Sequence, residues 1–228
     1  MSLRALIFDV DGTLAETEEA HRAAFNQIFA QWDLGWNWSV DDYRTLLKTT
    51  GGKERMRAHQ ATLPVGERRL SDEEIASLHK EKTAAYAAIL GRGDLELRPG
   101  VAELIDAGRK AGLKLAVATT TNTPNVEALC QCCWGVSALE IFDHVAAGDM
   151  VDNKKPAPDV FLLALEQLGL PPEDCIGFED SRNGVLSAKG AGLRVLVTPS
   201  AYTDTDNFDD ADWVIPDLTR ANLPPELA

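Results

Sequence analysis

Short apolar runs alternate with amphipathic stretches along much of the chain. The runs cover residues 4–8, 113–119, 141–146, 175–178, 194–198 and 213–215. Continuous apolar runs of this length are typical of parallel strands buried on both faces. Between two of them, Val101, Leu104 and Ile105 share one face of a predicted helix. Pro99 and Gly112 mark its ends. The alternation predicts an α/β fold built on a doubly wound parallel sheet.

Residues 15–90 lack a convincing strand and show helical spacing instead. Helices are predicted over residues 17–32, 40–47, 52–63 and 71–90. Ser71 and Glu74 form a capping box at the start of the last one. We therefore expect an all-helical domain, residues 15–93, inserted into an α/β core that comprises residues 1–14 and 94–228. The linkers, residues 14–16 and 91–97, would serve as hinges.

Composition narrows the range of partners. The 228 residues carry a formal net charge of −14, with 45% hydrophobic and 25% charged residues. This is the composition of a folded globular chain, and its negative charge makes nucleic acid an unfavourable partner. No apolar run approaches the roughly 18 residues of a membrane span, and the N-terminus lacks the pattern of a signal peptide. We expect a cytoplasmic protein that binds neither membrane nor nucleic acid.

The four cysteines are Cys130, Cys132, Cys133 and Cys175. Cys130 and Cys133 have a C-x-x-C spacing, but no second pair or histidine cluster completes a zinc site. Inert thiols in a reducing compartment are the favoured interpretation, and a metal or redox role is the alternative.

Two aspartates directly follow the first predicted strand, in the order Asp9-Val-Asp11-Gly-Thr. In an open parallel sheet, ligands bind beyond the carboxyl ends of the strands. The strand period of 2 is expected to place both carboxylates on one side of the chain. One could then attack a substrate while the other handles a proton. The alternative is a solvated Asp-Gly turn.

Polar residues follow three further strands. Hydroxyls and free N–H groups at residues 119–122 could hold an anion, or could simply cap a helix. Lys155, before Pro156, could neutralise a phosphate, or could be a surface lysine. Glu179 and Asp180 are adjacent carboxylates at the end of an apolar strand, where Mg²⁺ is the expected partner. The alternative for Asp180 is an N-cap of the next helix.

This ordered set of motifs resembles the haloacid dehalogenase superfamily of phosphotransferases, over the whole chain. The resemblance implies a Rossmann-like core with a helical cap. It also implies that Asp9 is the nucleophile that forms an aspartyl-phosphate and that Asp11 is the general acid/base. Thr119 would bind the phosphoryl group, and Lys155 would balance its charge. The implied Mg²⁺ ligands are the Asp9 carboxylate, the Asp11 backbone carbonyl and Asp180, with Glu179 close by.

Residues of the predicted cap extend the resemblance. The stretch at residues 49–55, Thr-Thr-Gly-Gly-Lys-Glu-Arg, is a glycine-rich turn with two cations, suited to a second anionic group. A helix cap and solvated helix faces are the alternatives. Together with residues 14–21 and 78–83, it resembles the CbbY-type branch of sugar-bisphosphate phosphatases. The implied substrate contacts are Asp9, Glu18, His21, Gly51, Gly52, Lys53, Glu54, Arg55, His79, Lys82, Thr119, Thr120, Thr121, Asn122, Asn125 and Lys155. Residues 61–70 depart from the branch as an apparent loop expansion.

The resemblance implies Mg²⁺-dependent hydrolysis of a small phosphorylated sugar, xylulose-1,5-bisphosphate, to xylulose-5-phosphate and phosphate. The alternatives are a mutase of the β-phosphoglucomutase kind, which shares the core motifs, and a phosphatase of another small sugar phosphate. A non-catalytic binding protein is disfavoured because Asp9, Asp11, Lys155 and Asp180 are all present. A monomer is expected.

Overall fold

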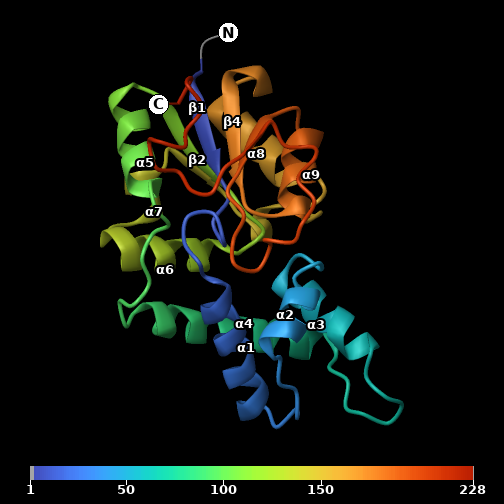
Figure 1. The fold of residues 1–228 in the computed structure, drawn as a ribbon. Coiled ribbons are helices and arrows are strands. Elements are labelled where there is room, and N and C mark those ends of the chain that lie inside the picture. Colours follow the sequence, from blue (N-terminus) through green and yellow to red (C-terminus); the bar gives the residue numbers. More distant parts are fainter. Residues whose placement is uncertain (1–2, 228) are drawn as a thin grey trace.

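A computed structural model describes residues 3–227. A six-stranded parallel sheet with the order β3-β2-β1-β4-β5-β6 forms its centre (Figure 1). The strands are β1 Ala5–Phe8, β2 Lys114–Ala118, β3 His144–Ala146, β4 Cys175–Glu179, β5 Arg194–Val197 and β6 Trp213–Val214. Because β1, β2 and β4 run parallel, the chain segments that follow them lie together at the carboxyl ends of the strands. The strand order reverses beside β1. The α/β class expected from the sequence is confirmed.

Helices cover both faces of the sheet. They are α5 Val101–Lys110, α6 Thr123–Trp134, α7 Ala138–Ile141, α8 Asp159–Leu168 and α9 Arg182–Gly190, with short 3₁₀ turns at Gly148–Met150 and Pro172–Asp174. Leu6 and Phe8 of β1 pack into the cluster that holds the apolar side chains of α5 and α6. Ala5 and Ile7 pack into the cluster of α8 and α9. The side-chain period of 2 along β1 therefore serves two separate apolar layers.

Four helices lie between β1 and α5, as a group beside the sheet (Figure 1): α1 Glu18–Gln31, α2 Val40–Leu46, α3 Gly52–Ala61 and α4 Asp72–Leu90. We call these helices and their connections the cap, and the rest of the chain the core. Capping boxes begin α2 at Ser39 and α4 at Ser71. The interior of the cap is aromatic: the Trp38 ring lies 4.8 Å from Phe25 and 4.7 Å from Phe29. The predicted helices agree with the observed ones to within about two residues, the usual uncertainty of helix ends.

The two connections between core and cap run side by side. Ala15 pairs with Leu97 in an antiparallel bridge, and the Arg98 N–H donates to the Leu14 carbonyl at 2.8 Å. The Arg98 guanidinium also donates to the carbonyls of Thr198 and Pro199, each at 2.7 Å. Both linkers are thus held against the core where the cap begins.

One segment differs from the sequence expectation, and one loop lies apart from the main layers of the fold. Residues 141–146 were expected to form one strand, but α7 ends at Ile141 and β3 begins only at His144. The reason is a capping box, in which Ser137 and Glu140 start a helix whose Ile141 packs into the apolar core. Residues 62–71 form a loop that extends from the cap (Figure 1), with Val65 fully exposed. Among residues 3–227, no helix is long and apolar enough to cross a membrane.

We predict that Phe8→Ala lowers the free energy of unfolding by about 3–5 kcal/mol, because a fully buried ring is lost and a cavity remains. The Phe8 ring stacks on Phe178 at 4.5 Å in the centre of the sheet. Urea denaturation followed by circular dichroism measures the change. The control is Leu162→Ala, since Leu162 is 48% exposed on α8, and it should stay within about 0.5 kcal/mol of the original chain. Equal effects of the two substitutions would contradict the prediction.

Candidate active site

A cavity of about 920 Å³ lies between the carboxyl edge of the sheet and the cap. Its wall combines residues that are far apart in the sequence, from the loop after β1, from α1, α3 and α4, and from the loops after β2 and β4. Most of the residues singled out in the sequence line it: Asp9, Asp11, Glu18, His21, Gly51, Gly52, Lys53, Glu54, Arg55, His79, Lys82, Thr120, Thr121, Asn122, Asn125, Lys155 and Asp180. Thr119 and Glu179 are buried just behind this wall.

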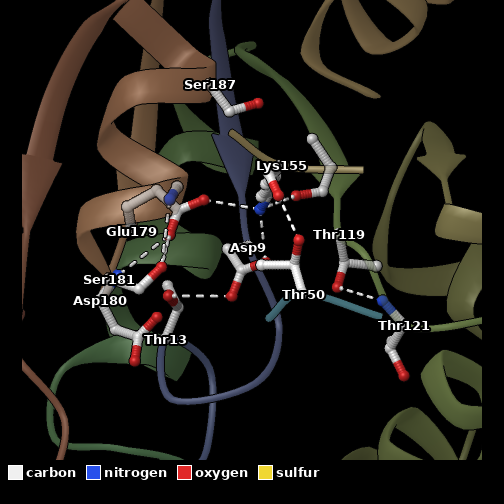
Figure 2. Close-up of polar contacts among 12 residues, drawn as sticks. Asp9, Thr13, Thr50, Thr119, Thr121, Lys155, Glu179, Asp180, Ser181 and Ser187 are labelled. Atoms are coloured by element: carbon white, nitrogen blue, oxygen red, sulfur yellow. Dashed lines mark hydrogen bonds and ion pairs between the residues drawn. The ribbon is translucent and has the colours of Figure 1, made fainter. Parts of the chain in front are cut away.

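Lys155 is at the centre of the core side of the site (Figure 2). Its ammonium donates to Asp9 Oδ1 and to Glu179 Oε1, each at 2.6 Å, and to the Ala118 carbonyl at 2.8 Å. The side chain is buried, which by itself would lower the pKa of Lys155, but Asp9 and Glu179 raise it above its ordinary value. Lys155 therefore stays charged and fixes one oxygen of Asp9. The preceding Lys154 instead reaches the backbone carbonyls of Val151 and Gly148.

Asp9, Glu179 and Asp180 bring buried carboxylate oxygens within 4.8 Å of one another. Burial, together with Glu179, raises the pKa of Asp9 to about 8 although Lys155 opposes the shift. Burial and the charges of Asp9 and Glu179 likewise raise the pKa of Asp180 well above its usual range. Lys155 alone thus does not keep Asp9 and Asp180 ionised. A hard divalent cation with oxygen ligands, such as Mg²⁺, would favour their ionised forms.

Two glycines make room for these carboxylates. A Cβ on Gly12 would collide with the carboxylate of Asp180, and Gly12 also has a φ of +82°. A Cβ on Gly184 would collide with the carboxylate of Glu179. Asp180 does not cap α9, because Ser181 does so, its hydroxyl accepting from the Gly184 N–H at 3.2 Å. The carboxylate of Asp180 is left facing the cavity.

Asp11 turns towards the cap rather than towards Lys155. Its Oδ1 accepts from the Thr17 hydroxyl at 2.6 Å and lies 2.9 Å from His21 Nε2. Asp9 and Asp11 thus have different hydrogen-bond partners, since β1 ends at Phe8 and the chain turns at Gly12. Burial alone would raise the pKa of Asp11, but His21 and Thr17 lower it to about 2. Asp11 is ionised without a ligand, and both aspartates still line one cavity.

A buried lysine extends this network in the cap. The Lys82 ammonium lies 2.5 Å from His21 Nδ1, and His21 stacks on the Tyr86 ring at 4.0 Å. Burial and the Lys82 charge lower the pKa of His21 to about 4, so the imidazole is neutral at pH 7. Burial also lowers the pKa of Lys82 to about 7. In the neutral imidazole, Nδ1 accepts from Lys82 and Nε2–H donates to Asp11.

Some buried polar atoms in the cavity wall have no hydrogen-bond partner among residues 3–227. Arg55 donates to the Tyr43 hydroxyl at 2.8 Å, yet its buried Nε has no acceptor. Glu18 Oε2 and Asn125 Oδ1 are buried without a donor, and burial raises the pKa of Glu18 to about 7 despite nearby Arg55. Buried polar groups are normally hydrogen-bonded. Because these residues line one cavity, we infer that a polar ligand supplies the missing hydrogen bonds.

The Gly-Gly pair lets α3 approach α4. A Cβ on Gly52 would collide with the imidazole of His79, so glycine permits the contact between the two helices. Burial, with the charges of Lys82 and Lys53, lowers the pKa of His79 to about 3. His79 is therefore neutral, and Lys53 is exposed at the rim.

Polar contacts across the cavity hold the cap against the core. The Thr50 hydroxyl donates to the Lys155 carbonyl (Figure 2). Asn183 donates to the Lys48 carbonyl at 3.1 Å, and Asn122 donates to the Thr83 hydroxyl at 3.0 Å.

Sequence reasoning singled out neither Thr17 nor Asn183, and it included Thr50 only as part of the glycine-rich stretch at residues 49–55. Thr50 stands directly before the glycine pair, which is a usable signal. Nothing local marks the other two.

Comparisons with known proteins show which family this chain resembles. The profile of the haloacid dehalogenase-like hydrolase family matches residues 3–192. Protein CbbY of Rhodobacter capsulatus is 59% identical over 221 residues, which cover 97% of this chain and 96% of that protein. The crystal structure of a CbbY variant from Rhodobacter sphaeroides in complex with xylulose-1,5-bisphosphate is 49% identical, with a TM-score of 0.92 and 96% of each chain covered.

A β-phosphoglucomutase from Clostridium difficile is 22% identical, with a TM-score of 0.78 over 95% of this chain and 92% of that one. At this identity the likeness concerns the fold alone.

The raised pKa of Asp9 predicts how the stability of the metal-free protein depends on pH. The folded state keeps a proton on Asp9 up to about pH 8, whereas an unfolded aspartate loses it near 3.8. Between these values the folded state binds more protons, so its free energy of unfolding falls as pH rises. Asp9→Asn removes this titration. It should raise the stability at pH 8 by more than about 1 kcal/mol, since one pKa unit is worth about 1.4 kcal/mol.

Urea unfolding in EDTA, at pH values on both sides of neutrality, measures this gain, which should grow with pH. Asp106→Asn is the control, because Asp106 is exposed on α5, and it should change the stability by less than about 0.5 kcal/mol. A gain that does not depend on pH would show that Asp9 is ionised in the folded, metal-free protein.

Proposed function

Because this chain belongs to the haloacid dehalogenase-like hydrolase family and is a phosphatase, we propose that it hydrolyses xylulose-1,5-bisphosphate to xylulose-5-phosphate and phosphate. The observation that carries the proposal is a single cavity lined by both the core and the cap. Its core wall has the nucleophile candidate Asp9 beside Lys155, and its cap wall has buried polar atoms of Arg55 and Glu18 that lack a partner among residues 3–227. A substrate with a phosphate at each end matches such a site, and a relative 49% identical has been crystallised with this sugar bisphosphate.

In this proposal, Asp9 attacks the phosphorus and forms an aspartyl-phosphate. Lys155 holds Oδ1, and the contact of Oδ2 with the Thr13 hydroxyl is long, at 3.4 Å. Oδ2 is therefore the oxygen free to attack. Thr119, at the end of β2, and Lys155 bind the phosphoryl oxygens and balance their charge.

Mg²⁺ held by Asp9, Asp180 and the backbone carbonyl of Asp11, with Glu179 close by, would neutralise phosphoryl charge and favour ionised Asp9. The three buried carboxylates and the space beside Gly12 support this ligand set.

Asp11 acts in this scheme as the acid and then as the base. A bound phosphoryl group adds negative charge beside Asp11 and raises its affinity for a proton. Asp11 can then protonate the leaving sugar oxygen. Once the sugar has left, the ionised carboxylate takes a proton from the water that attacks the aspartyl-phosphate. Thr17 and His21 hold one oxygen of Asp11, so the other can face the substrate.

We also propose that residues 15–93 move as a cap relative to the core, residues 1–14 and 94–228. The paired linkers at Ala15 and Leu97 would be the hinge. The contacts that close the cavity include Thr50 with the Lys155 carbonyl and Asn183 with the Lys48 carbonyl. Such polar contacts can be exchanged for water when the cap opens, which suits substrate entry and product release.

The first test is phosphate release with Mg²⁺ from xylulose-1,5-bisphosphate, ribulose-1,5-bisphosphate and β-glucose-1-phosphate with a trace of its 1,6-bisphosphate. We expect selective release from xylulose-1,5-bisphosphate. Asp9→Asn should lower kcat by at least about 10³-fold, because no other group replaces the nucleophile. Asp106→Asn should retain activity. Formation of glucose-6-phosphate without net phosphate release would identify a mutase instead.

A second test concerns the cap end of the cavity. Arg55→Ala should raise KM for the bisphosphate about 10- to 100-fold, because it removes one charge-assisted hydrogen bond to the second phosphate. The change in KM for a sugar monophosphate should be much smaller. Arg57→Ala is the matched control, since Arg57 is two residues further on and pairs with exposed Asp72. Steady-state kinetics on both substrates measures the difference. An equal loss on both would show that Arg55 supports the cap rather than the distal phosphate.

A further inference from the structure

A turn of the core at residues 198–206 follows β5 and contacts the cap. In Figure 1 this orange-red segment descends from the core towards α2. Arg44 of α2 donates to Asp204 Oδ1 at 2.6 Å and to the Ala201 carbonyl at 2.8 Å. Its guanidinium also lies 5.5 Å from the centre of the Tyr202 ring. The cap thus holds the turn through one arginine that binds two of its residues and covers a third.

The same turn contacts Asp180, which together with Asp9 and Glu179 forms the carboxylate cluster. The Thr203 hydroxyl donates to the Asp180 carbonyl at 2.6 Å, lies 3.3 Å from Asp180 Oδ2, and accepts from the Ser200 N–H at 3.0 Å. A Cβ on Gly12 would meet both the Asp180 carboxylate and the Ser200 side chain, so this carboxylate lies in a tight space bounded by the turn. The position of Asp180 therefore depends on where the turn lies.

Apolar packing strengthens the connection between turn and cap. Tyr202 is 7% exposed, and its ring meets the buried ring of Tyr43 edge-on at 5.9 Å. Tyr43 in turn accepts from Arg55 in the cavity wall. The turn is also tied to the first linker, because the Ala201 N–H donates to Glu16 at 3.4 Å. Cap, hinge and carboxylate cluster meet at these few residues.

We propose that this turn couples closure of the cap to cation binding, with Thr203 as the positioning residue for Asp180 and Arg44 as the cap residue that holds the turn. The proposal rests on the Mg²⁺ site of the proposed function. Arg44 binds Asp204, the residue next to Thr203, so loss of the Arg44 contacts frees the peptide that carries the Thr203 hydroxyl. Because binding linkage is reciprocal, a cation that favours the ordered turn also favours the closed cap.

The test measures Mn²⁺ affinity of the full chain without substrate, from the electron paramagnetic resonance signal of free Mn²⁺. Thr203→Val should weaken binding about 10-fold, the usual effect of losing a group that orients a metal ligand. Thr203→Ser keeps the hydroxyl and should stay within about 2-fold of the original affinity. Arg44→Leu should weaken binding about 5-fold. In the double variant the losses should not add, because Arg44 acts through Thr203.

The controls copy the same contacts inside the cap. Thr62→Val removes a hydroxyl that donates to the His59 carbonyl at 2.7 Å. Arg68→Leu removes a guanidinium that binds Glu74 at 3.1 Å and the Trp32 carbonyl at 3.3 Å. Both should leave Mn²⁺ affinity unchanged, even where thermal unfolding shows lower stability.

The outcomes separate this inference from the proposed function. If the original chain binds Mn²⁺ and both Arg44→Leu and Thr203→Val bind it equally well, the coupling is wrong and the phosphatase proposal stands. Losses that simply add in the double variant would overturn the route through Thr203. If the original chain binds no Mn²⁺, the metal site and the coupling both fail. Should Thr203→Val not fold, the two single variants Arg44→Leu and Asp204→Asn decide the matter, because Asp204 is exposed and Arg44 is only partly buried.

Discussion

Burial of three carboxylates at one edge of the sheet is the constraint on which the rest of the site depends. Asp9, Glu179 and Asp180 are almost inaccessible to solvent, and isolated buried charges of this kind are strongly unfavourable. Lys155 offsets part of the cost through two ion pairs and is itself anchored to a strand carbonyl. A divalent cation would offset the remaining negative charge, so that an anionic phosphoryl group can approach Asp9. The unfavourable free energy of burying these carboxylates is thus the basis of the proposed chemistry.

The division of the two aspartates between core and cap follows from the same geometry. Asp9 is held by a core lysine, whereas Asp11 is held by Thr17 and His21 at the start of the cap. A residue proposed to move protons is therefore positioned by the part of the molecule that is proposed to move. In this proposal the arrangement links proton transfer to cap closure, because an open cap would displace the partners of Asp11. The turn at residues 198–206 gives the cap a corresponding contact route to Asp180, through Arg44 and Thr203.

Local patterns predicted the elements and the motif positions well. Apolar runs located β1, β2, β4 and β5, and a capping box marked the start of α4. The carboxyl ends of parallel strands meet at one edge of the sheet, so the order of the motifs along the chain was enough to group Asp9, Lys155 and Asp180. The strand expected at residues 141–146 failed because apolar content alone does not separate a helix that packs on the sheet from a strand within it.

The sequence by itself determined the fold class, the four helices inserted after β1 and most of the polar residues that line the cavity, because these depend on periodicity and on motifs within a few residues. Only the tertiary structure decided which side chains these polar residues contact. Three contacts join segments that are apart in the sequence: Asp11 with His21, Arg55 with Tyr43, and Arg44 with Asp204 beside Thr203. No local pattern encodes them, since they depend on how α1–α4 close over the sheet. The same closure buries the carboxylates, and it is burial that shifts their pKa values.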